Sequence, residues 1–402
     1  MRVLISGAGI AGLSLALRLD QRGLMPVLVE RSPTVRAGGY MLGLVDPGYD
    51  AAARMSIIED LRKVRYAPQQ LVYIDPDGTE SFRLERRALA SLAGARQLSL
   101  MRGDIERVLY AKVRDRAEFH FDRSIAAVEA TPAGVVATLN DGTTLEADLV
   151  VGADGLHSRI RSLCFGPEEQ FVRFLGARVA AFVLNRDDFP DIGPGETYSM
   201  TEVGRGSAIA SVGDGRLVAF FVFRARPAHK FDHVDAELRY AFCDARWHVG
   251  RLLAGLSKAT SVYFDDVAQV ICPRWSSGRV VLLGDAGSAV SLIAGGGASL
   301  AMAGAYILAE ALADTPQDIA GALARYEKRM RPLVDKGQKM ARRQRRALSA
   351  EQPFPSCPAQ CSSPCGIFAS RGRNHGTPAQ SPRGQALTAY PQIKTPPARA
   401  GL

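Results

Sequence analysis

Cysteine is scarce in this chain. Only six cysteines stand among 402 residues, and three of them are isolated, at Cys164, Cys243 and Cys272. Isolated cysteines give no disulfide framework, and such sparing use is typical of a reducing compartment. The sequence therefore predicts a cytoplasmic location.

A metal-binding pattern is also hard to find. Cys357, Cys361 and Cys365 are evenly spaced with His375 nearby, but prolines interrupt the series. Zinc sites generally combine more closely spaced cysteine pairs with ligands elsewhere in the chain. We expect no metal site.

Long, purely apolar stretches are missing too. The longest uncharged run, Ala289–Ala309, contains three consecutive glycines, so it suits a buried helix better than a bilayer. The N-terminal apolar run to Leu17 resembles a signal peptide, but glycines interrupt it, and Arg18 and Asp20 follow at once. The sequence predicts neither membrane insertion nor a secretory signal.

Positive charge is in excess but unevenly placed. The net charge is +9, and residues 325–346 alone hold ten lysines and arginines against two acidic residues. Basic charge on a C-terminal helix usually marks a solvated face, and no nucleic-acid-binding module accompanies it. We expect no nucleic-acid partner.

The first thirty residues carry the strongest pattern. Residues 2–6 predict a buried strand, residues 13–22 a helix and residues 24–30 a second strand. The turn between the first strand and the helix contains Gly7, Gly9, Ile10, Ala11 and Gly12.

These glycines have distinct roles in a strand–turn–helix unit. Gly7 permits the tight turn, Gly9 admits a pyrophosphate close to the backbone, and Gly12 lets helix and strand pack closely. The helix N-terminus attracts phosphate, and Glu30 follows at the spacing of a carboxylate that accepts ribose hydroxyls. The unit predicts a site for an ADP-containing cofactor.

The loop after Glu30 contains glycines, among them Gly39, and could fold back over a bound cofactor. Arg31 and Arg36 could reach its phosphates or ribose, or they could be two surface arginines. Residues 51–64 predict a helix and 67–75 a strand that ends near a hairpin turn at Asp77-Gly78.

Two later strands also end in glycine and aspartate. Residues 149–151 run into Gly152-Ala153-Asp154-Gly155, and residues 279–283 run into Gly284-Asp285. One dinucleotide could be contacted by several such turns. Taken singly, each aspartate is also compatible with an ordinary helix cap.

The centre of the chain has a different pattern. Runs at 172–184, 196–203, 207–212 and 216–223 are strand-like, which predicts an antiparallel sheet, and residues 239–255 predict a helix. Residues 180–184, Ile209 and 220–223 are expected to give an apolar pocket lining. Strands are also expected at 119–129, 134–140 and 144–151, and helices at 297–312 and 318–347. Asp104 is expected to cap a helix that ends near residue 113.

The glycine–acid motifs, in this order, resemble those of the FAD-dependent aromatic hydroxylases. These are single-component flavoprotein monooxygenases similar to p-hydroxybenzoate hydroxylase and the tetracycline-modifying monooxygenases. The resemblance covers residues 1–348 and implies an α/β fold with a Rossmann-like FAD-binding domain, an inserted antiparallel-sheet substrate domain and C-terminal helices. The implied boundaries are 1–165 and 275–348 for the first domain, 166–274 for the second, and 349–402 for a disordered low-complexity tail.

The resemblance also assigns residues to the cofactor. It implies that Gly7, Gly9 and Gly12 hold the ADP part of FAD, that Glu30 binds the adenosine ribose, and that Arg102, just before a helix, contacts the cofactor.

The second motif and the C-terminal residues complete this assignment. Asp154-Gly155 with Ser158 and Arg161 matches a motif implicated in both FAD and NAD(P)H binding. Asp285 would hold the ribityl chain. Leu292 to Gly297, with Gly295 between them, would lie beside the isoalloxazine ring at a helix N-terminus, which suits an anionic reduced flavin.

The implied activity is a hydroxylation. NADPH or NADH would reduce FAD, the reduced flavin would react with O2, and the resulting C4a-hydroperoxide would transfer oxygen to an aromatic or polyketide-like small molecule. We expect a monomer or a homodimer. No catalytic acid or base is assigned, and His157 is expected to be a loop residue.

The sequence departs from the family pattern in one region. Gly287, Ser288 and Val290 replace the usual residues after Gly284-Asp285, and Gly296 replaces a glutamine or glutamate. An inactive or non-enzymatic FAD-binding homologue therefore stays open as an alternative. A flavin-dependent halogenase is a weaker one, because the two tryptophans lie far apart and form no W-x-W-x-I-P motif.

Overall fold

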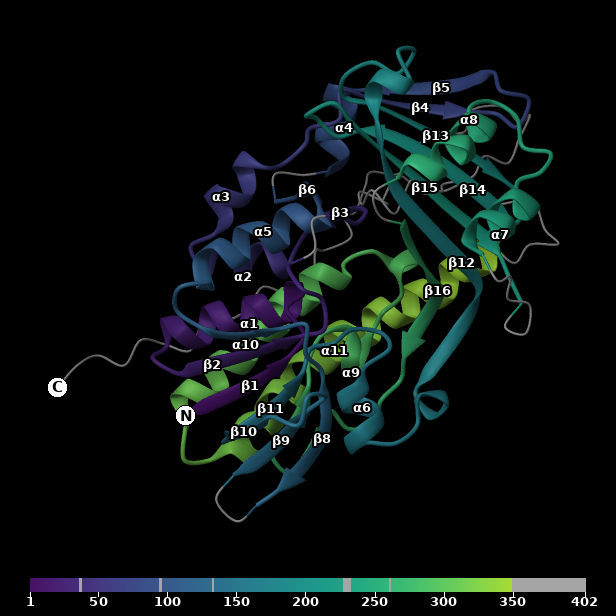
Figure 1. Ribbon diagram of the computed structural model, residues 1–402. Coiled ribbons are helices and arrows are strands. Elements are labelled where there is room, and N and C mark those ends of the chain that lie inside the picture. Colours follow the sequence, from purple (N-terminus) through teal and green to yellow (C-terminus); the bar gives the residue numbers. More distant parts are fainter. Residues whose placement is uncertain (36–37, 94–95, 132–133, 227–232, 260–261, 349–402) are drawn as a thin grey trace, which may run out of the picture.

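The computed structural model describes residues 1–348 with gaps at 36–37, 94–95, 132–133, 227–232 and 260–261. Two large sheets lie at opposite ends of the molecule, and the C-terminal helices run from one toward the other (Figure 1). The tail 349–402, with Cys357, Cys361, Cys365 and His375, lies outside the described residues, as does Arg36.

A six-stranded sheet is built around the N-terminal strand, in the order β17-β18-β11-β1-β2-β7. Every neighbouring pair is parallel except β17 with β18. Its strands are β1 (Arg2–Ser6), β2 (Met25–Glu30), β7 (Glu118–Phe121), β11 (Leu149–Gly152), β17 (Ser276–Ser277) and β18 (Val280–Leu282). Because β18, β11 and β1 are parallel neighbours, their three glycine turns meet at one edge of the sheet, where such folds bind ligands.

Helices cover this sheet. The first helix, α1 (Ile10–Gln21), packs against α10 (Gly297–Asp314) and α5 (Arg102–Val113). Ile10, Leu13 and Leu17 are buried at the spacing of one helix face. The last helix, α11 (Ile319–Leu348), packs on α10 and leaves many of its basic side chains exposed.

A small three-stranded sheet, β8 (Ile125–Ala130), β9 (Val135–Leu139) and β10 (Thr144–Ala147), flanks the large one. Two predicted strands are each divided in two. The segment 119–129 is interrupted at Asp122, whose φ is +55°. The segment 144–151 is interrupted at Asp148, whose carboxylate accepts a hydrogen bond from the Arg2 backbone N–H at 2.7 Å.

The second large sheet has seven strands in the order β16-β12-β15-β14-β13-β4-β5, and only β13 with β4 is parallel. The expected antiparallel sheet is therefore confirmed. Its strands are β4 (Gln70–Ile74), β5 (Glu80–Glu85), β12 (Val172–Asn185), β13 (Glu196–Glu202), β14 (Arg205–Ser211), β15 (Arg216–Arg224) and β16 (Val262–Val270). β16 was not expected, and β4 and β5 come from outside 166–274, so that boundary stays a prediction.

The two faces of this sheet bury different residues. Phe182, Ile209 and Phe221 pack with α7 (Val234–Ala241) and α8 (Val249–Gly255) into a separate core. Phe220 lies on the opposite face, because strand side chains alternate. The residues expected to line one pocket are thus divided between two faces.

Three helix predictions need correction. Segment 51–64 forms α2 (Gly48–Arg54) and α3 (Ile58–Lys63), separated at Ser56, whose φ is +60°. Segment 239–255 was expected to be one helix, but α7 and α8 are separated near Trp247, whose φ is +57°. Asp104 is not an N-cap: α5 begins at Arg102, and Asp104 is buried in its first turn, paired with Arg107 and Arg216.

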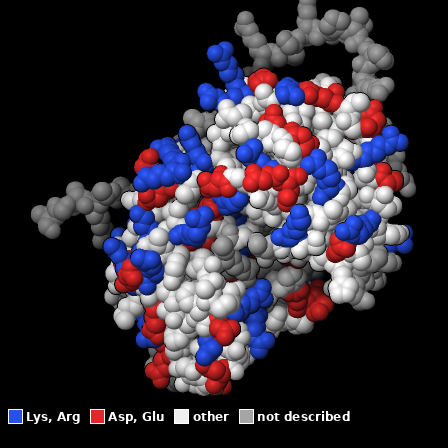
Figure 2. Space-filling view, turned by 45° about the horizontal axis from the view of Figure 1, so that its top comes forward, with Lys and Arg blue, Asp and Glu red and all other residues white. Residues whose placement is uncertain are grey.

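The remaining elements connect these layers. They are β3 (Met41–Leu44), β6 (Leu98–Met101), α4 (Arg86–Ala93), α6 (Arg159–Cys164), α9 (Asp285–Ser288), and the short 3-10 turns η1 (Glu168–Gln170), η2 (Arg186–Asp188), η3 (Leu256–Lys258) and η4 (Leu292–Ala294). Within the described ranges, no helix has the length and apolarity to cross a membrane. Basic and acidic side chains are interspersed over the face in Figure 2.

Candidate cofactor site

The site begins at the turn between β1 and α1. Gly7 has φ +103°, and a Cβ there would lie 2.6 Å from the Ala153 carbonyl oxygen. A Cβ on Gly12 would lie 1.9 Å from the Gly7 carbonyl oxygen. The turn therefore closes this tightly only with glycine at both positions. The N-terminus of α1, which follows the turn, opens toward a cavity.

A cavity of about 470 Å³ lies at this edge of the six-stranded sheet, a size typical of small-molecule and cofactor sites. It brings together residues from the ends of β1, β2 and β11, from α5 and β16, and from the start of α10. Of the residues predicted from sequence, those in its wall are Gly7, Gly9, Ile10, Ala11, Glu30, Arg31, Arg102, Asp154, Gly155, Asp285, Leu292, Gly295 and Gly297.

Five predicted residues of the described ranges do not line the cavity: Gly12, Gly39, Ser158, Arg161 and Gly284. Gly39 has φ +133°, and a Cβ there would approach the Arg102 Cβ to 3.1 Å. Gly284 has φ +62° and starts α9. These glycines shape the backbone that presents the cavity residues.

Glu30 lies at the end of β2 and is buried. Its carboxylate accepts hydrogen bonds from the Ala8 N–H at 2.7 Å and from the Ser32 N–H at 3.0 Å. It therefore fixes the glycine turn against β2 while it lines the cavity. A carboxylate has capacity for further hydrogen bonds, so Glu30 can also accept one from a ligand hydroxyl.

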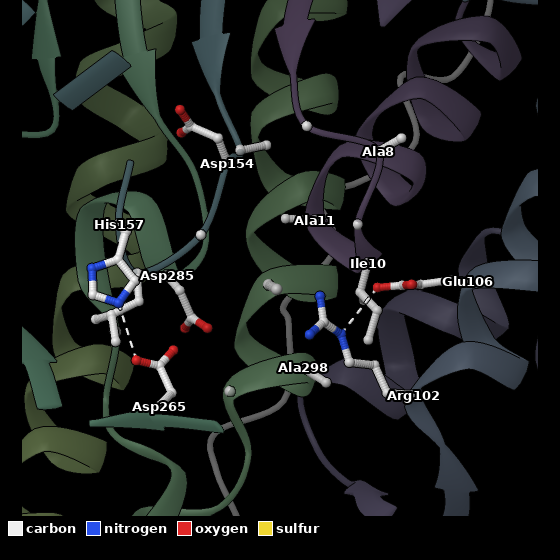
Figure 3. Close-up of a pocket in the computed structure, with 18 of the residues that line it drawn as sticks. Ala8, Ile10, Ala11, Arg102, Glu106, Asp154, His157, Asp265, Asp285 and Ala298 are labelled. Atoms are coloured by element: carbon white, nitrogen blue, oxygen red, sulfur yellow. Dashed lines mark hydrogen bonds and ion pairs between the residues drawn. The ribbon is translucent and has the colours of Figure 1, made fainter. Parts of the chain in front are cut away.

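The second motif uses its aspartate to hold its own helix. The Asp154 carboxylate accepts hydrogen bonds from Ser158 Oγ at 2.5 Å, from Arg159 N at 2.8 Å and from Ile160 N at 3.1 Å. Burial raises the pKa of this carboxyl, and the hydrogen bonds oppose that shift. Its side chain points away from Asp285 and Arg102 (Figure 3).

Arg161 is fully buried and joins three segments. Its guanidinium donates to the Leu156 carbonyl at 2.8 Å, to the Ala286 carbonyl at 2.9 Å and to Glu168 at 3.1 Å. Burial lowers the pKa of this group, and Glu168 opposes that shift. Arg161 thus connects the turn before α6 to α9.

Asp285 is the first residue of α9 and its side chain is exposed to the cavity, with protein surrounding the cavity on several sides. Partial removal from water by the surrounding protein raises the pKa of Asp285. The charge of Arg102 opposes this shift, and the charge of Asp265 adds to it. A Cβ on Gly297, the first residue of α10, would lie 3.8 Å from Asp285 Oδ1. A carboxylate and an open helix N-terminus therefore share one end of the cavity.

Arg102 reaches into the cavity from the start of α5. Its Nε lies 3.0 Å from Oε1 of Glu106, and Figure 3 shows this pair across the cavity from Asp285. Burial lowers the pKa of Arg102, but Glu106, Tyr40 and Tyr263 together raise it by more, so the guanidinium stays charged.

Sequence reasoning missed the residues that β16 contributes. Tyr263 lines the cavity, and its ring centroid lies 4.7 Å from that of Tyr40. Burial raises the pKa of Tyr263 well above its usual value, so its phenol stays protonated. Asp265 lines the same wall. The signal was weak because Asp265-Asp266 interrupts the apolar pattern of the strand.

His157 lies in a turn, as expected, but it also lines the cavity. Its Nδ1 is 2.9 Å from Glu168 Oε1 and its Nε2 is 3.0 Å from Asp265 Oδ1. Hydrogen bonds to Asp265 and Glu168 raise its pKa to about 9, against burial. The ring is therefore a cation at neutral pH and is no general base there.

The altered region after Asp285 has a packing explanation. A Cβ on Gly287 would lie 2.8 Å from the Leu282 Cβ, so the Leu282 side chain leaves room only for glycine here. Ser288 donates a hydrogen bond to the Gly284 carbonyl at 3.0 Å. At Gly287 and Ser288, the departure from the family pattern is accommodated by the local structure. Within the described ranges no group of histidine, cysteine and acidic residues could hold a metal ion.

Comparison with known proteins identifies the family. A family profile described as an FAD binding domain matches residues 1–339. A flavin-dependent monooxygenase from an unknown prokaryotic organism is 31% identical over 341 residues, which cover 84% of this chain and 87% of that protein. The chain belongs to the FAD-dependent aromatic hydroxylase family.

Solved structures of similar proteins agree with this assignment. Tetracycline destructase Tet(55) is 30% identical with a TM-score of 0.75, covering 84% of this chain and 87% of that one. HpxO of Klebsiella pneumoniae, complexed with FAD and uric acid, is 27% identical with a TM-score of 0.68, covering 85% and 87%. The chain is thus an FAD-binding enzyme of this family.

The residues present in the cavity fit FAD. The glycine turn leaves room where a Cβ would intrude, and the N-termini of α1 and α10 open into the cavity, where they favour anionic groups. Glu30 and Asp285 are carboxylates at separate parts of the wall, and each can accept hydrogen bonds from sugar-type hydroxyls.

Proposed function

We propose that this monooxygenase uses NADPH or NADH and O2 to hydroxylate an aromatic or polyketide-like small molecule. The proposal is based on one observation: a single cavity is lined by the β1–α1 turn, Glu30, Asp285 and the start of α10. FAD bound there supplies the redox chemistry, and the protein supplies binding, orientation and protection from water. The nicotinamide cofactor would bind transiently, since the first glycine unit is assigned to FAD.

The residues of the wall would divide the cofactor between them. The α1 N-terminus, beside Gly7 and Gly9, would bind the pyrophosphate, and Glu30 the adenosine ribose. Arg31, exposed at the rim, would add positive charge near this end. Support comes from the open helix N-terminus and from the buried, hydrogen-bonded Glu30 carboxylate.

At the other end, Asp285 would accept hydrogen bonds from the ribityl hydroxyls, and Gly295 to Gly297 would lie beside the flavin ring. The partial positive charge of the α10 N-terminus would stabilise the anionic reduced flavin. Arg102 would contact the cofactor while Glu106 holds its guanidinium. Ser158 and Arg161 would support the wall without touching the cofactor, because neither lines the cavity.

The Tyr40–Tyr263 pair would limit water entry on the side of the seven-stranded sheet. Both rings line the cavity, and they pack against each other. Exclusion of water matters in this chemistry because water favours release of hydrogen peroxide over transfer of oxygen to the substrate.

The test is a measurement on purified protein. We expect a yellow preparation that oxidises NADPH or NADH faster when a phenol, quinolone or polyketide substrate is added, with oxygen from O2 in the product. Bound FAD without oxidation of either nicotinamide across that panel would support an inactive homologue instead. We also propose that the enzyme is cytoplasmic and either monomeric or homodimeric, which cell fractionation and light scattering would check.

A further inference from the structure

Two buried glutamines, Gln269 of β16 and Gln338 of α11, bind the same short segment of the cavity wall without lining the cavity themselves. Gln269 Nε2 donates hydrogen bonds to the Val290 carbonyl at 3.1 Å and to the Gln338 backbone carbonyl at 2.9 Å. Gln338 Nε2 donates to the carbonyls of Ala289 at 3.2 Å and Val270 at 2.8 Å. Each amide nitrogen meets two carbonyl oxygens, which fixes the orientation of both carboxamides.

The last helix supports this arrangement from outside the cavity. Arg342 Nη1 donates to Gln269 Oε1 at 3.1 Å, so the carboxamide that binds Val290 is itself held at its oxygen. A Cβ on Gly337 of α11 would lie 2.9 Å from Val290 Cγ1, so the helix packs closely against the segment. The Val290 carbonyl is therefore turned toward β16 and α11.

The next residue, Ser291, has an unfavourable backbone conformation. It lines the cavity with φ +87° and ψ 144°, a region that residues other than glycine rarely adopt. A half-turn of the Val290–Ser291 peptide plane would bring its φ to about −90°, which together with this ψ is ordinary extended backbone. That half-turn would break the hydrogen bond from Gln269 to the Val290 carbonyl. The glutamine therefore holds the peptide in the less favourable of its two orientations.

The orientation of this peptide decides which polar group faces the cavity. In a trans peptide the carbonyl and the following N–H point in opposite directions, so the Ser291 N–H points away from Gln269. In the described parts of the chain this N–H has no hydrogen-bond partner, although Ser291 is buried. Buried backbone N–H groups are almost always bonded, so an unbonded one on a cavity wall is available to a ligand.

We propose that the Ser291 N–H donates a hydrogen bond to the flavin ring, and that Gln269 and Gln338 are positioning residues. They keep this donor, rather than the Val290 carbonyl, facing the cavity. The inference rests on the proposed function, which places the flavin ring beside Gly295 to Gly297, a few residues further along the same wall.

The physical consequence concerns the charge of the reduced flavin. An N–H donor on the cavity wall stabilises negative charge, whereas a carbonyl oxygen in the same place would oppose it. The Ser291 N–H thus acts in the same direction as the N-terminus of α10. Because a reduced flavin carries more negative charge than an oxidised one, the donor favours binding of reduced FAD and raises the reduction potential.

Reduction potentials of the FAD-loaded proteins test the inference, measured with a chemical reductant and a reference dye. Gln269→Met removes the donor at nearly constant side-chain length. We expect the affinity for reduced relative to oxidised FAD to fall about tenfold, which lowers the potential by about 30 mV. Gln338→Met should shift it in the same direction. Gln21→Met is the matched control, because the Gln21 amide also donates to a backbone carbonyl, that of Met55 at 2.9 Å, but lies away from the cavity wall, and its potential should be unchanged.

A second substitution separates positioning from general support of the fold. Glycine adopts positive φ without strain, so Ser291→Gly in the Gln269→Met background removes the preference for the turned peptide. We expect about half or more of the lost potential to return, relative to Ser291→Gly alone. Ser291→Ala in the same background keeps the Cβ and should restore nothing. If Gln269 only supported the fold, glycine and alanine at this position would give the same potential.

The outcomes that overturn the inference are distinct from those that overturn the proposed function. Unchanged potentials in both FAD-loaded glutamine variants, or equal potentials with glycine and alanine at position 291, would overturn it. If the glutamine variants take up no FAD, a crystal structure of the wild-type holoprotein decides: we expect the Ser291 nitrogen within about 3.2 Å of a flavin atom, and a distance above about 3.5 Å overturns the inference.

The potential is measured without substrate or nicotinamide. The expected shifts in a protein that oxidises neither NADPH nor NADH would therefore support the inference and overturn only the proposed activity. A wild-type protein that binds no FAD would overturn both.

Discussion

Two glycine–acid turns follow the neighbouring parallel strands β1 and β11 and border the same cavity. They differ in whether their polar groups are open to the cavity or already bonded within the protein. The first turn presents backbone: Gly7 and Gly9 leave the N-terminus of α1 open, and Glu30 supports it from the next strand. The second turn closes on itself, because Asp154 accepts hydrogen bonds from the first two N–H groups of α6, and the buried Arg161 of α6 donates to the Ala286 carbonyl of α9.

The difference shows that a shared motif can leave backbone groups open to a cavity in one place and hold its own helix in another. What decides the role is which polar groups are already satisfied by the protein. The Asp154 carboxylate accepts three hydrogen bonds from its own segment, whereas Asp285 exposes its carboxylate to the cavity. Substitutions that act on one turn and spare the other test this contrast.

The largest effect is expected for Gly12→Ala in the first turn. The added Cβ would lie 1.9 Å from the Gly7 carbonyl oxygen, so the strand and helix must move apart. We expect a loss above about 4 kcal/mol and little folded, yellow protein, measured as yield and by urea unfolding.

Gly155→Ala in the second turn is the matched control. Gly155 has φ +84°, and no atom lies within 4 Å of the place that a Cβ would take, so only the backbone conformation costs energy, about 1–2 kcal/mol. A Gly12→Ala protein as stable as Gly155→Ala would contradict the tight closure of the first turn.

Next in size is Arg161→Met. Removal of the buried guanidinium takes the donor away from the Ala286 and Leu156 carbonyls and leaves Glu168 paired with His157 alone, and we expect a loss of about 3 kcal/mol of unfolding free energy. FAD affinity of the folded protein should change by about twofold or less, because Arg161 does not line the cavity. Arg114→Met, at an exposed position, is the stability control. Unchanged stability with lost FAD affinity would instead mean direct contact with the cofactor.

Smaller effects, on FAD affinity or on stability, are expected for alanine substitutions of Asp285 and Asp154. Asp285→Ala should weaken FAD binding about tenfold, close to 1.4 kcal/mol, with little change in the unfolding of the apoprotein. Asp154→Ala should do the reverse and destabilise the apoprotein by about 1 kcal/mol through loss of its hydrogen bonds to α6. Calorimetric titration measures the FAD affinity, and thermal unfolding measures the stability of the apoprotein. Equal changes of both quantities in the two variants would contradict the different roles of Asp285 and Asp154.

The smallest effect is the pH dependence of stability that arises from His157, which pairs with Asp265 of β16. The pKa of His157 is raised from 6.5 to about 9 in the folded protein, so its contribution to stability is complete below about 6.5 and is lost as the pH rises through about 9. The midpoint of thermal unfolding of the wild-type apoprotein should therefore approach that of His157→Gln across this window. A constant difference between the two proteins up to pH 10 would show that the His157 ion pairs add nothing.

The sequence allowed the structure of the first turn to be predicted almost completely, because its shape depends on local geometry. Three glycines at fixed spacing, apolar strands on both sides and Glu30 at the end of β2 are all visible within thirty residues. The antiparallel sheet was predictable for a similar reason, since its strands alternate or run as apolar segments between glycines.

The parts that were missed depend on tertiary contacts. The helix breaks at Ser56 and Trp247 require positive φ at residues that give no sign of it in the sequence. Asp104 was expected at a cap but is buried beside Arg107 and Arg216, a residue more than a hundred positions away. Asp265 pairs with His157, and that pairing joins segments more than a hundred positions apart.

The position of β4 and β5 has a consequence for any attempt to exchange parts of this enzyme. These strands belong to the N-terminal portion of the chain, yet β4 pairs with β13 and completes the far edge of the seven-stranded sheet. Residues 166–274 taken alone would leave β13 as a bare edge, ready to pair with another chain. An exchange that keeps this sheet intact has to move residues 70–85 as well.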